Sequence, residues 1–406
     1  MSKEIKKAPT IRFRGFTDDW EQRKLGELIT EYKEVVTSNC TLPILTSSKS
    51  EGVILQEKHF GHKQNHDITG YNILPRWYCT YRNRSDGVDF TFNINRYCDK
   101  GIISKFYPVF CGNKNDTFFI SLVLNNSKGV IREIGYTCTG TGQKVLAFSD
   151  LQKMKIPTTS FDEQAKIGQY FLSLDQLITL HQRKLDQLKK LKIYFLQNLF
   201  PAKGEKVPRI RFKGFTGDWK QSELEELATF SKGIGYSKSD LLDSGKPIIL
   251  YGRLYTKYET VITNTDTFVD EKDGSVHSLG GEVIVPASGE TAEDISIASV
   301  VKKSGIIIGG DLNIIHPSNN IDSTFLAISI SNGEPHKDMA RRAQGKSVVH
   351  LHNDDLSKIK LWYPSLEEQR RIGQYFCNID SLINLNQHKI NELQTLKKYM
   401  IQNMFI

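Results

Sequence analysis

Two separate blocks of this sequence occur twice, and no other feature constrains the fold as strongly. Residues 9–28 return as residues 208–227 with 13 identities in 20, at an offset of 199. Residues 163–200 return as residues 368–405 with 20 identities in 38, at an offset of 205. Internal repeats fix the architecture of a chain before any local motif does, so we expect a molecule built from two copies of one frame.

The segments that the repeated blocks enclose differ from each other. Roughly, residues 29–140 in the first half and residues 228–340 in the second half show no alignment. The chain is therefore a duplicated frame that carries two different inserts. A constant frame with two different inserts suggests a protein that reads two different things at a fixed separation.

The second pair of repeated blocks predicts two long helices. Apolar residues recur in alternating steps of four and three for about five heptads in each copy, which is the pattern of a coiled coil. Each helix of about 38 residues would be roughly 55 Å long. The first seam consists of Ile167, Phe171, Leu174, Ile178, His181, Leu185, Leu188, Lys192, Phe195 and Leu199. The second seam consists of Ile372, Phe376, Ile379, Ile383, Asn386, Ile390, Leu393, Lys397, Met400 and Met404.

Both seams are interrupted by polar residues at matching positions. These residues are His181 and Lys192 in the first copy, and Asn386 and Lys397 in the second. A polar residue in an apolar seam costs stability but fixes the register of the pair. If the two helices pair antiparallel with their ends level, His181 and Asn386 meet at the centre. The alternative is that either side chain points toward solvent at a loosened turn.

The two inserts read mainly as strands and turns, with helices between them. Their apolar runs are rich in β-branched and aromatic residues and are bounded by Gly, Pro, Asn and Asp. We therefore expect each insert to be a small mixed α/β domain. The strand-like runs are residues 52–60, 71–83, 118–126, 246–258, 281–289 and 304–315.

The composition describes a soluble chain with more than one domain. The chain has 406 residues, of which 39 % are apolar and 25 % charged, and a chain of this length usually forms two or more cores. A net charge of +8 favours phosphate-rich partners without deciding the fold. The six cysteines are scattered without a C-x-x-C motif, which indicates reduced thiols in a cytoplasmic protein. We see no signal peptide and no membrane span, so no membrane partner is expected.

The sequence lacks signatures of catalysis but contains candidate nucleic-acid contacts. No Asn-Pro-Pro aromatic tetrapeptide is present, and no Gly-rich dinucleotide loop follows a strand. Nucleic-acid readers need cations for phosphates, and polar or aromatic groups for bases. Residues 76–85 and 251–258 interleave these types, although a strand with core aromatics and solvated Arg and Lys would read the same. Residues 142–144 and 345–347 lie just ahead of the two helical blocks, where backbone and Lys groups could clamp phosphate.

The candidate DNA-contacting residues fall in both halves of the chain, and no metal ligands or catalytic residues are assigned. They are Arg76, Tyr78, Tyr81, Arg82, Arg84, Lys105, Gln143, Lys144, Tyr251, Arg253, Tyr255, Lys257, Ser288, Lys346 and Ser347.

The repeated RF-x-GF…W block has two interpretations that can hold together. Its aromatic residues can form the first packed turn of each half, or the block can offer equivalent docking surfaces to two copies of one partner. These residues are Phe13, Phe16, Trp20, Phe212, Phe215 and Trp219.

The order of insert, long helix, insert, long helix resembles the specificity subunit of type I restriction–modification systems, over essentially the whole chain. The most telling pieces are the paired RF-x-GF…W openings and the segment LQKMKIP (151–157), which leads into Glu163-Gln164 and IGQYF, with their second copies. Residues 94–110 and 285–295 also resemble readers of that family. One departure is Pro364, which is displaced relative to Pro157.

This resemblance implies a fold and a set of partners. The fold class would be mixed α/β, with two target-recognition domains, each followed by a long helix, and with the helices paired as an antiparallel coiled coil of pseudo-two-fold symmetry. Each domain would read one half of a split double-stranded DNA target, and helix length would set the spacer. Two methylase subunits would dock on the frame and restriction/motor subunits would join them. S-adenosylmethionine, ATP and Mg would be bound by these partners and not by this chain, which would itself be non-catalytic.

The implied boundaries follow the repeats. They are 1–155 for the first target-recognition domain, 156–200 for the central spacer helix, 201–209 for a linker, 210–362 for the second target-recognition domain and 363–406 for the C-terminal spacer helix. Symmetric readers would meet half-sites about one helical turn apart, roughly 34 Å. Because the two inserts differ, the target should be asymmetric.

Two other classes of function stay open on the sequence. One is a self-sufficient DNA-modifying enzyme with an unrecognised site. The other is a protein-only scaffold built on the helical hairpin. Methyl transfer by the chain alone would favour the first, and binding that is absent or insensitive to salt would favour the second.

Overall fold

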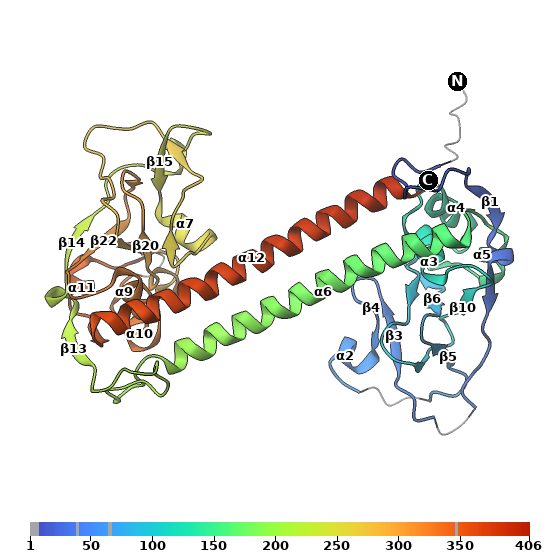
Figure 1. Cartoon of the computed structure of the whole chain (residues 1–406), viewed down its shortest axis with the longest axis horizontal. Helices are drawn as coiled ribbons and strands as arrows, with labels where there is room; N and C mark the ends of the chain where they lie inside the picture. The colour runs from blue at the N-terminus through green and yellow to red at the C-terminus, as the bar shows by residue number, and fades with distance from the viewer. Residues whose placement is uncertain (1–7, 38–39, 64–66, 346–347) are drawn as a thin grey trace. The chain divides into compact units, whose positions relative to one another are not determined.

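Helices α6 (Phe161–Asn198) and α12 (Leu366–Met404) are the two long helices that the heptad pattern predicts (Figure 1). The computed structural model describes residues 8–37, 40–63, 67–345 and 348–406. The chain divides into two units. Unit 1 contains the chain up to His181 together with Lys389–Ile406, and unit 2 contains Gln182–His388. Each unit therefore combines one insert with part of each long helix, and the predicted mixed α/β class is confirmed.

Both long helices begin later than the predicted spacer segments 156–200 and 363–406. The reason is that a short strand precedes each helix and pairs with a strand of the repeated N-terminal block. Each insert therefore begins and ends on neighbouring antiparallel strands, which closes the insert at its base. These strands are β1 (Glu21–Lys24) with β12 (Lys155–Thr158) in unit 1, and β13 (Lys220–Glu223) with β24 (Lys360–Tyr363) in unit 2.

The insert of unit 1 is built on a four-stranded antiparallel sheet. The strands of the whole unit 1 insert, within and outside this sheet, are β2 (Ile29–Glu31), β3 (Leu45–Ser48), β4 (Gly52–Leu55), β5 (Asn72–Pro75), β6 (Cys79–Thr80), β7 (Arg84–Ser85), β8 (Asn93–Ile94), β9 (Lys100–Ile103), β10 (Val109–Gly112) and β11 (Lys144–Val145). Its helices are α1 (Leu25–Leu28), α2 (Gln56–Phe60), α3 (Thr117–Asn126), α4 (Lys128–Thr137) and α5 (Phe148–Lys153). The sheet has the order β2-β10-β6-β8, and α3 packs against β6, β8 and β10. The pairs β3–β4, β5–β9 and β7–β11 complete the strand pairing.

The insert of unit 2 has a larger sheet of five strands. The strands of the whole unit 2 insert, within and outside this sheet, are β14 (Ala228–Lys232), β15 (Lys246–Ile249), β16 (Val261–Ile262), β17 (Phe268–Val269), β18 (Glu282–Pro286), β19 (Ser288–Gly289), β20 (Ser299–Val301), β21 (Ile307–Ile308), β22 (Leu312–Pro317) and β23 (Val349–His350). Its helices are η1 (Leu224–Glu226), η2 (Lys238–Asp240), α7 (Tyr251–Thr256), α8 (Ala292–Ile295), α9 (Ser323–Ile330), α10 (Gly333–Arg342) and α11 (Asn353–Ser357). The main sheet has the order β14-β22-β18-β20-β16, beside a sheet of order β17-β15-β21 and the pair β19–β23.

Three runs predicted as strands are helical over part or all of their length. Residues 118–126 lie in α3, and the second parts of 52–60 and 246–258 form α2 and α7. Helix α3 is apolar on all sides because it is buried among its neighbours, and Phe119–Leu124 are all buried. A fully buried helix and a fully buried strand give the same apolar run, so periodicity cannot separate them.

The two inserts share a structural motif that their sequences do not reveal. In unit 1 the Asp116 carboxylate caps α3 by accepting from the Phe119 backbone N–H (2.6 Å), and in unit 2 Asp322 caps α9 in the same way (2.9 Å). The backbone N–H of each aspartate donates to a glutamine at the start of the long helix, Gln164 (2.9 Å) or Gln369 (2.8 Å). The repeated Glu-Gln pair of the sequence is thus part of the attachment of each insert.

Aromatic residues of the repeated N-terminal block pack against the long helix and the insert of their own unit. This confirms the interpretation of the block as a packed turn, while docking of a partner on it stays a prediction. The matched ring contacts are Phe13–Tyr170 (5.7 Å) and Trp20–Phe119 (5.6 Å) in unit 1, and Phe212–Tyr375 (5.5 Å) and Trp219–Phe325 (5.7 Å) in unit 2.

A bidentate ion pair joins the repeated block to the start of each long helix. The Arg12 guanidinium donates to both oxygens of Glu163 (2.6 and 2.7 Å), and Arg211 does the same to Glu368 (2.7 Å to each oxygen). Both carboxylates are buried, with Glu368 only 1 % exposed. The pairing raises the pKa of Arg12 and of Arg211, chiefly through the hydrogen bonds to these carboxylates.

Substitution of Arg211 by Ala is expected to destabilise unit 2 strongly. The buried Glu368 carboxylate would lose its cation, and an uncompensated buried charge costs about 3 kcal/mol or more. Urea unfolding of the full chain measures the effect. Arg209→Ala removes an exposed arginine two residues away and is the matched control. Equal unfolding midpoints for the two variants would show that the ion pair does not hold the block to the helix.

Among the described residues, no helix has the length and apolar character needed to cross a membrane.

Candidate nucleic-acid interface

In unit 1, two chain segments bring exposed cations beside one exposed aromatic ring. The Arg84 guanidinium carbon lies 4.6 Å from the centroid of the Phe106 ring, and the Lys105 Nζ lies 5.8 Å from the same centroid. The Asn83 backbone N–H donates to the Phe106 carbonyl (2.9 Å), which holds the two segments together. We call Arg84, Lys105 and Phe106 the unit 1 cation patch, and Arg82 is exposed two residues before Arg84. Phe106 was missed in the sequence, although its position beside Lys105 is a usable signal.

A hairpin adjoins this patch and carries two more candidates. Strand β11 pairs with β7, so that Lys144 lies opposite Ser85. Gln143 is exposed at the turn. The Lys144 ammonium donates to the Gly140 carbonyl (2.7 Å), so this cation is partly engaged by its own hairpin.

Three other candidates of the segment 76–85 lie apart from the patch. Tyr81 is fully buried, and its hydroxyl donates to the Leu146 carbonyl (3.0 Å). This position is a correction, because a core side chain that faces Leu146 cannot contact DNA. Tyr78 packs edge-on against Tyr32 (5.1 Å), and burial raises the pKa of Tyr78. Arg76 is half-exposed and pairs with Asp99 (3.4 Å).

Unit 2 has an equivalent hairpin at the same place in the frame. Thr139 and Val145 exchange two backbone hydrogen bonds in unit 1, and the residues 205 positions later, Gln344 and His350, exchange the same two in unit 2. Both hairpins turn at a glycine with positive φ, Gly140 or Gly345, where an added Cβ would collide with a carbonyl oxygen across the turn. The structure therefore matches Gly345 with Gly140, and not with Gly142 as the comparison of residues 142–144 with 345–347 implies. Lys346 and Ser347 lie outside the described residues.

The aromatic segment of unit 2 forms helix α7 and separates into exposed and structural residues. Arg253 is 8 % exposed and donates to Glu259 (2.7 Å) and to Asp266. Lys257 also pairs with Asp266 (2.9 Å), and these two cations lower the pKa of Asp266 to about 2, the Lys257 hydrogen bond being the larger cause. Arg253 therefore serves the structure, and its assignment as a DNA contact is corrected. Lys257 keeps an exposed ammonium.

Tyr255 and Ser288 anchor the unit 2 hairpin to α7. The Tyr255 hydroxyl donates to the Ser288 carbonyl (2.6 Å), and Ser288 lies opposite His350 in the β19–β23 pair. Burial raises the pKa of Tyr255, and Ser288 is buried. Tyr251 packs edge-on against Tyr255 (5.9 Å) and is the more exposed of the two rings. His350, which the sequence did not indicate, is exposed beside them.

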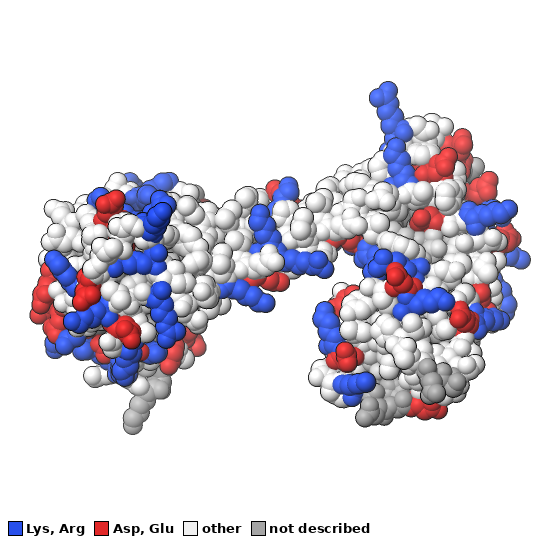
Figure 2. Space-filling model, turned by 60° about the horizontal axis from the view of Figure 1, so that its bottom comes forward, with Lys and Arg blue, Asp and Glu red and all other residues white. Residues whose placement is uncertain are grey.

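Lys and Arg side chains lie among Asp and Glu side chains on both units in the view of Figure 2. The described residues form no uninterrupted basic surface on this face. Phosphate contacts need cations that are not already neutralised. Local clusters such as the unit 1 cation patch are therefore better candidates for DNA contacts than the basic side chains of the chain as a whole.

The seam lysines pair with aspartates of the other long helix inside each unit. In unit 1 Lys397 of α12 lies 2.6 Å from Asp175 of α6, and in unit 2 Lys192 of α6 lies 2.5 Å from Asp380 of α12. The start of each helix therefore lies beside the end of the other. Asn386 is buried, and its amide donates to the Leu382 carbonyl (2.7 Å), while His181 is partly buried. A meeting of His181 with Asn386 stays a prediction.

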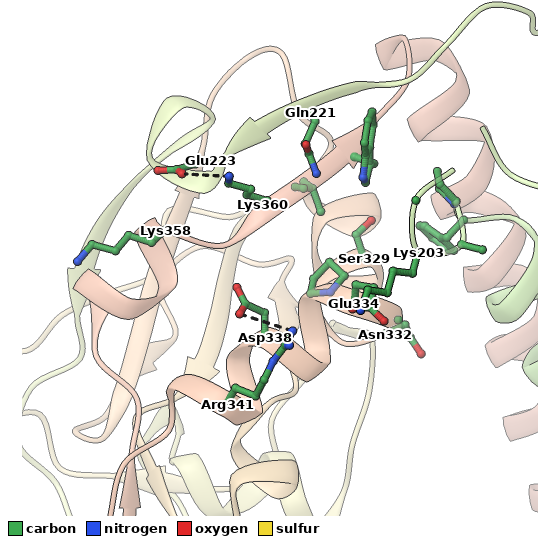
Figure 3. Close-up of a pocket in the computed structure, with 18 of the residues that line it drawn as sticks. Lys203, Gln221, Glu223, Ser329, Asn332, Glu334, Asp338, Arg341, Lys358 and Lys360 are labelled. Atoms are coloured by element: carbon green, nitrogen blue, oxygen red, sulfur yellow. Dashed lines mark ion pairs between the residues drawn. The ribbon is translucent and has the colours of Figure 1, made fainter. Parts of the chain in front are cut away.

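A surface cavity of about 720 Å³ lies in unit 2 between the linker after α6, strands β13 and β24, and helix α10 (Figure 3). Its charged residues largely neutralise one another, since Glu223 pairs with Lys360 (4.0 Å) and Asp338 with Arg341 (3.8 Å). The Ser329 hydroxyl lines the cavity and has no hydrogen-bond partner among the described residues. No described member of the candidate DNA-contacting set lines this cavity, so we do not place the interface there.

A family model described as the type I restriction modification DNA specificity domain matches the chain twice, over residues 17–190 and 216–395. The two matches coincide with the two copies of the frame and its inserts.

Curated relatives and a solved structure are also similar to this chain. The type I restriction enzyme MjaVIII specificity subunit of Methanocaldococcus jannaschii is 23 % identical over 279 residues, which span 66 % of this chain and 64 % of that protein. The putative type I restriction enzyme MjaX specificity subunit of the same organism is 23 % identical over 308 residues, 72 % of this chain and 68 % of that protein. The crystal structure of a type I restriction–modification S subunit from M. genitalium has the same fold, with a TM-score of 0.60, 16 % identity and coverage of 98 % of this chain and 99 % of that chain.

Proposed function

Because the chain belongs to the type I restriction modification DNA specificity family, we propose that it reads a bipartite DNA target and directs methylase and restriction subunits to that target. The observation that carries the proposal is the pairing of one duplicated frame with two different inserts. Each insert ends on an equivalent two-stranded base that leads into its own long helix, α6 or α12, yet one insert has a four-stranded sheet and the other a five-stranded sheet. Two inserts that are attached in the same way but have different surfaces suit two half-sites of different sequence.

The long helices are proposed to act as an antiparallel coiled coil that sets the spacer between half-sites. None of the predicted seam residues is exposed: each is buried or partly buried along both helices. The Lys–Asp pairs join the helices in each unit at positions related by the same offset of 205. A paired seam resists bending better than a single helix, and a rigid rod is what a fixed spacer requires.

Two methylase subunits are proposed to dock on equivalent surfaces of the frame. Exposed apolar side chains on the long helices recur at an offset of 205, and each unit presents one set. Exposed apolar side chains that recur in this way are typical of a surface that a partner protein covers in the assembly. The sets are Leu177, Leu180, Leu396 and Tyr399 in unit 1, and Leu382, Leu385, Leu191 and Tyr194 in unit 2.

The chemistry is proposed to belong to the partners. The methylase subunits would bring S-adenosylmethionine, and the restriction/motor subunits would bring ATP and Mg. This chain would supply the address on DNA and would not itself transfer a methyl group. Methyl transfer by the purified chain alone would favour a self-sufficient enzyme in its place.

Substitution of Arg84 by Ala tests the DNA-reading proposal at the unit 1 cation patch. One lost phosphate contact should reduce the slope of log affinity against log salt by about one and weaken binding. The measurement is a salt titration of DNA binding by the chain assembled with methylase. Arg23→Ala, which removes an exposed arginine of β1, is the control. DNA binding that is absent or insensitive to salt, even with methylase added, would favour a protein-only scaffold. An unchanged slope in Arg84→Ala would remove this patch from the interface.

A further inference from the structure

The aspartates that pair with the seam lysines also hold the inserts. Lysine binds Oδ1 of the aspartate in both units, and the other oxygen, Oδ2, is bound by the insert. In unit 1 the Arg96 Nη1 and Nη2 each lie 3.2 Å from Asp175 Oδ2. In unit 2 the Thr260 hydroxyl donates to Asp380 Oδ2 (2.9 Å). One carboxylate in each unit therefore joins both long helices and the insert.

The frame half of this junction is repeated, while the insert half is not. Asp175 and Asp380 are related by the offset of 205, as are the two lysines. Arg96 and Thr260 come from inserts without sequence similarity, and one donor is a guanidinium while the other is a hydroxyl. A carboxylate accepts from either kind of donor. A fixed acceptor can thus hold inserts of different sequence at the same place.

Both insert donors are themselves fixed in position. Arg96 follows Asn95, which is fully buried and whose amide donates to the carbonyls of Leu74 (2.9 Å) and Cys98 (3.0 Å). Thr260 is buried, and its carbonyl accepts from the Val300 backbone N–H (2.9 Å). The aspartates are only partly exposed, at 19 % for Asp175 and 24 % for Asp380, so solvent screens these contacts less than those of a surface pair.

We propose that Asp175 and Asp380 are positioning residues that fix the angle of each insert on the helix pair and so restrict the complex to one spacer length. The inference rests on the proposed function of reading two half-sites across a spacer. One base pair more or less moves a half-site by about 3.4 Å and turns it by roughly 35°. An insert that can pivot follows such a change, and an insert held at its anchor does not.

The test uses the full chain assembled with its methylase subunits. Initial methylation rates are measured on duplexes with the native spacer and with spacers one base pair shorter or longer. Arg96→Ala and Asp175→Ala are each expected to lower the preference for the native spacer by about fivefold, the factor that a partly shielded ion pair can supply. The rate on the native spacer should change less. Thr260→Val should act in the same direction through unit 2.

Lys49→Ala is the matched control, because it breaks an exposed ion pair with Asp89 inside the same insert and leaves the contacts of Asp175 intact. It should keep the spacer preference.

Unchanged preference in Arg96→Ala, Asp175→Ala and Thr260→Val would overturn the proposal. An equal loss of rate on all spacers in Arg96→Ala, with a lower salt slope, would also overturn it and would identify Arg96 as a phosphate contact. If Asp175→Ala does not fold, Arg96→Ala and Thr260→Val carry the test, since both keep the Lys–Asp pairs. A wild-type complex indifferent to spacer length would instead contradict the proposed function.

Discussion

A chain that lacks residues 180–186 and 385–391 is expected to read the same two half-sites across a shorter spacer. The deletion removes one heptad from each long helix, so both seams stay in phase and the Lys192–Asp380 and Lys397–Asp175 pairs are retained. Seven residues correspond to about 10 Å of helix, which is at most about three base pairs of duplex. The bases of the half-sites should not change, because neither insert is altered.

Methylome sequencing of a host that carries the shortened chain and its partners measures both quantities at once. A second deletion, of residues 182–188 and 387–393, keeps His181 and Asn386 and should shorten the spacer equally. Deletion of a heptad from one helix alone is the negative control, because the two Lys–Asp pairs can no longer form together. A changed half-site, or an unchanged spacer, would refute the role of the helices as a ruler.

Replacement of residues 29–140 by the corresponding insert of another family member is expected to change one half-site completely and leave the other intact. The ends of the insert leave from the neighbouring strands β1 and β12, so a foreign insert can enter without moving the frame. The core of unit 1 includes residues of both frame and insert, such as Trp20 and Phe119. We therefore expect the best exchanges to keep the apolar residues of α3 that meet the frame.

The readout is the list of methylated sequences before and after the exchange. The reciprocal exchange of residues 228–340 should alter the opposite half-site, which provides the internal control. A foreign insert that offers a donor to Asp175 should preserve the spacer as well. Simultaneous change of both half-sites would show that the inserts do not read independently.

The repeats predicted the frame well because identity at a fixed offset is a direct record of shared structure. The seam residues of both helices have the low exposure that the heptad pattern requires. The two short strands before the helices were missed because Lys155–Thr158 and Lys360–Tyr363 pair with strands far away in sequence. Nothing local in Ile156-Pro157 indicates that partner.

The candidate interface was predicted less well, for a physical reason. Aromatic and basic residues alternate in the segment 76–85, but the sequence does not tell which of them face the core. Tyr81 and Arg253 turned out to be buried and hydrogen-bonded to partners inside their own units. The grouping of Arg84 with Lys105 depends on a contact between separate segments, which only the fold supplies.

The main aromatic core of each unit is made of residues of that unit. The core of unit 1 includes Trp20, Phe171 and Phe405, and the core of unit 2 includes Phe200, Trp219 and Phe376. Cooperative unfolding extends only as far as shared packing does. A lesion that melts one half should therefore leave the other folded. Such a chain would not simply be lost to the cell. It would persist with one folded unit and would compete with the intact chain, because it could occupy a partner subunit or a half-site without completing a target.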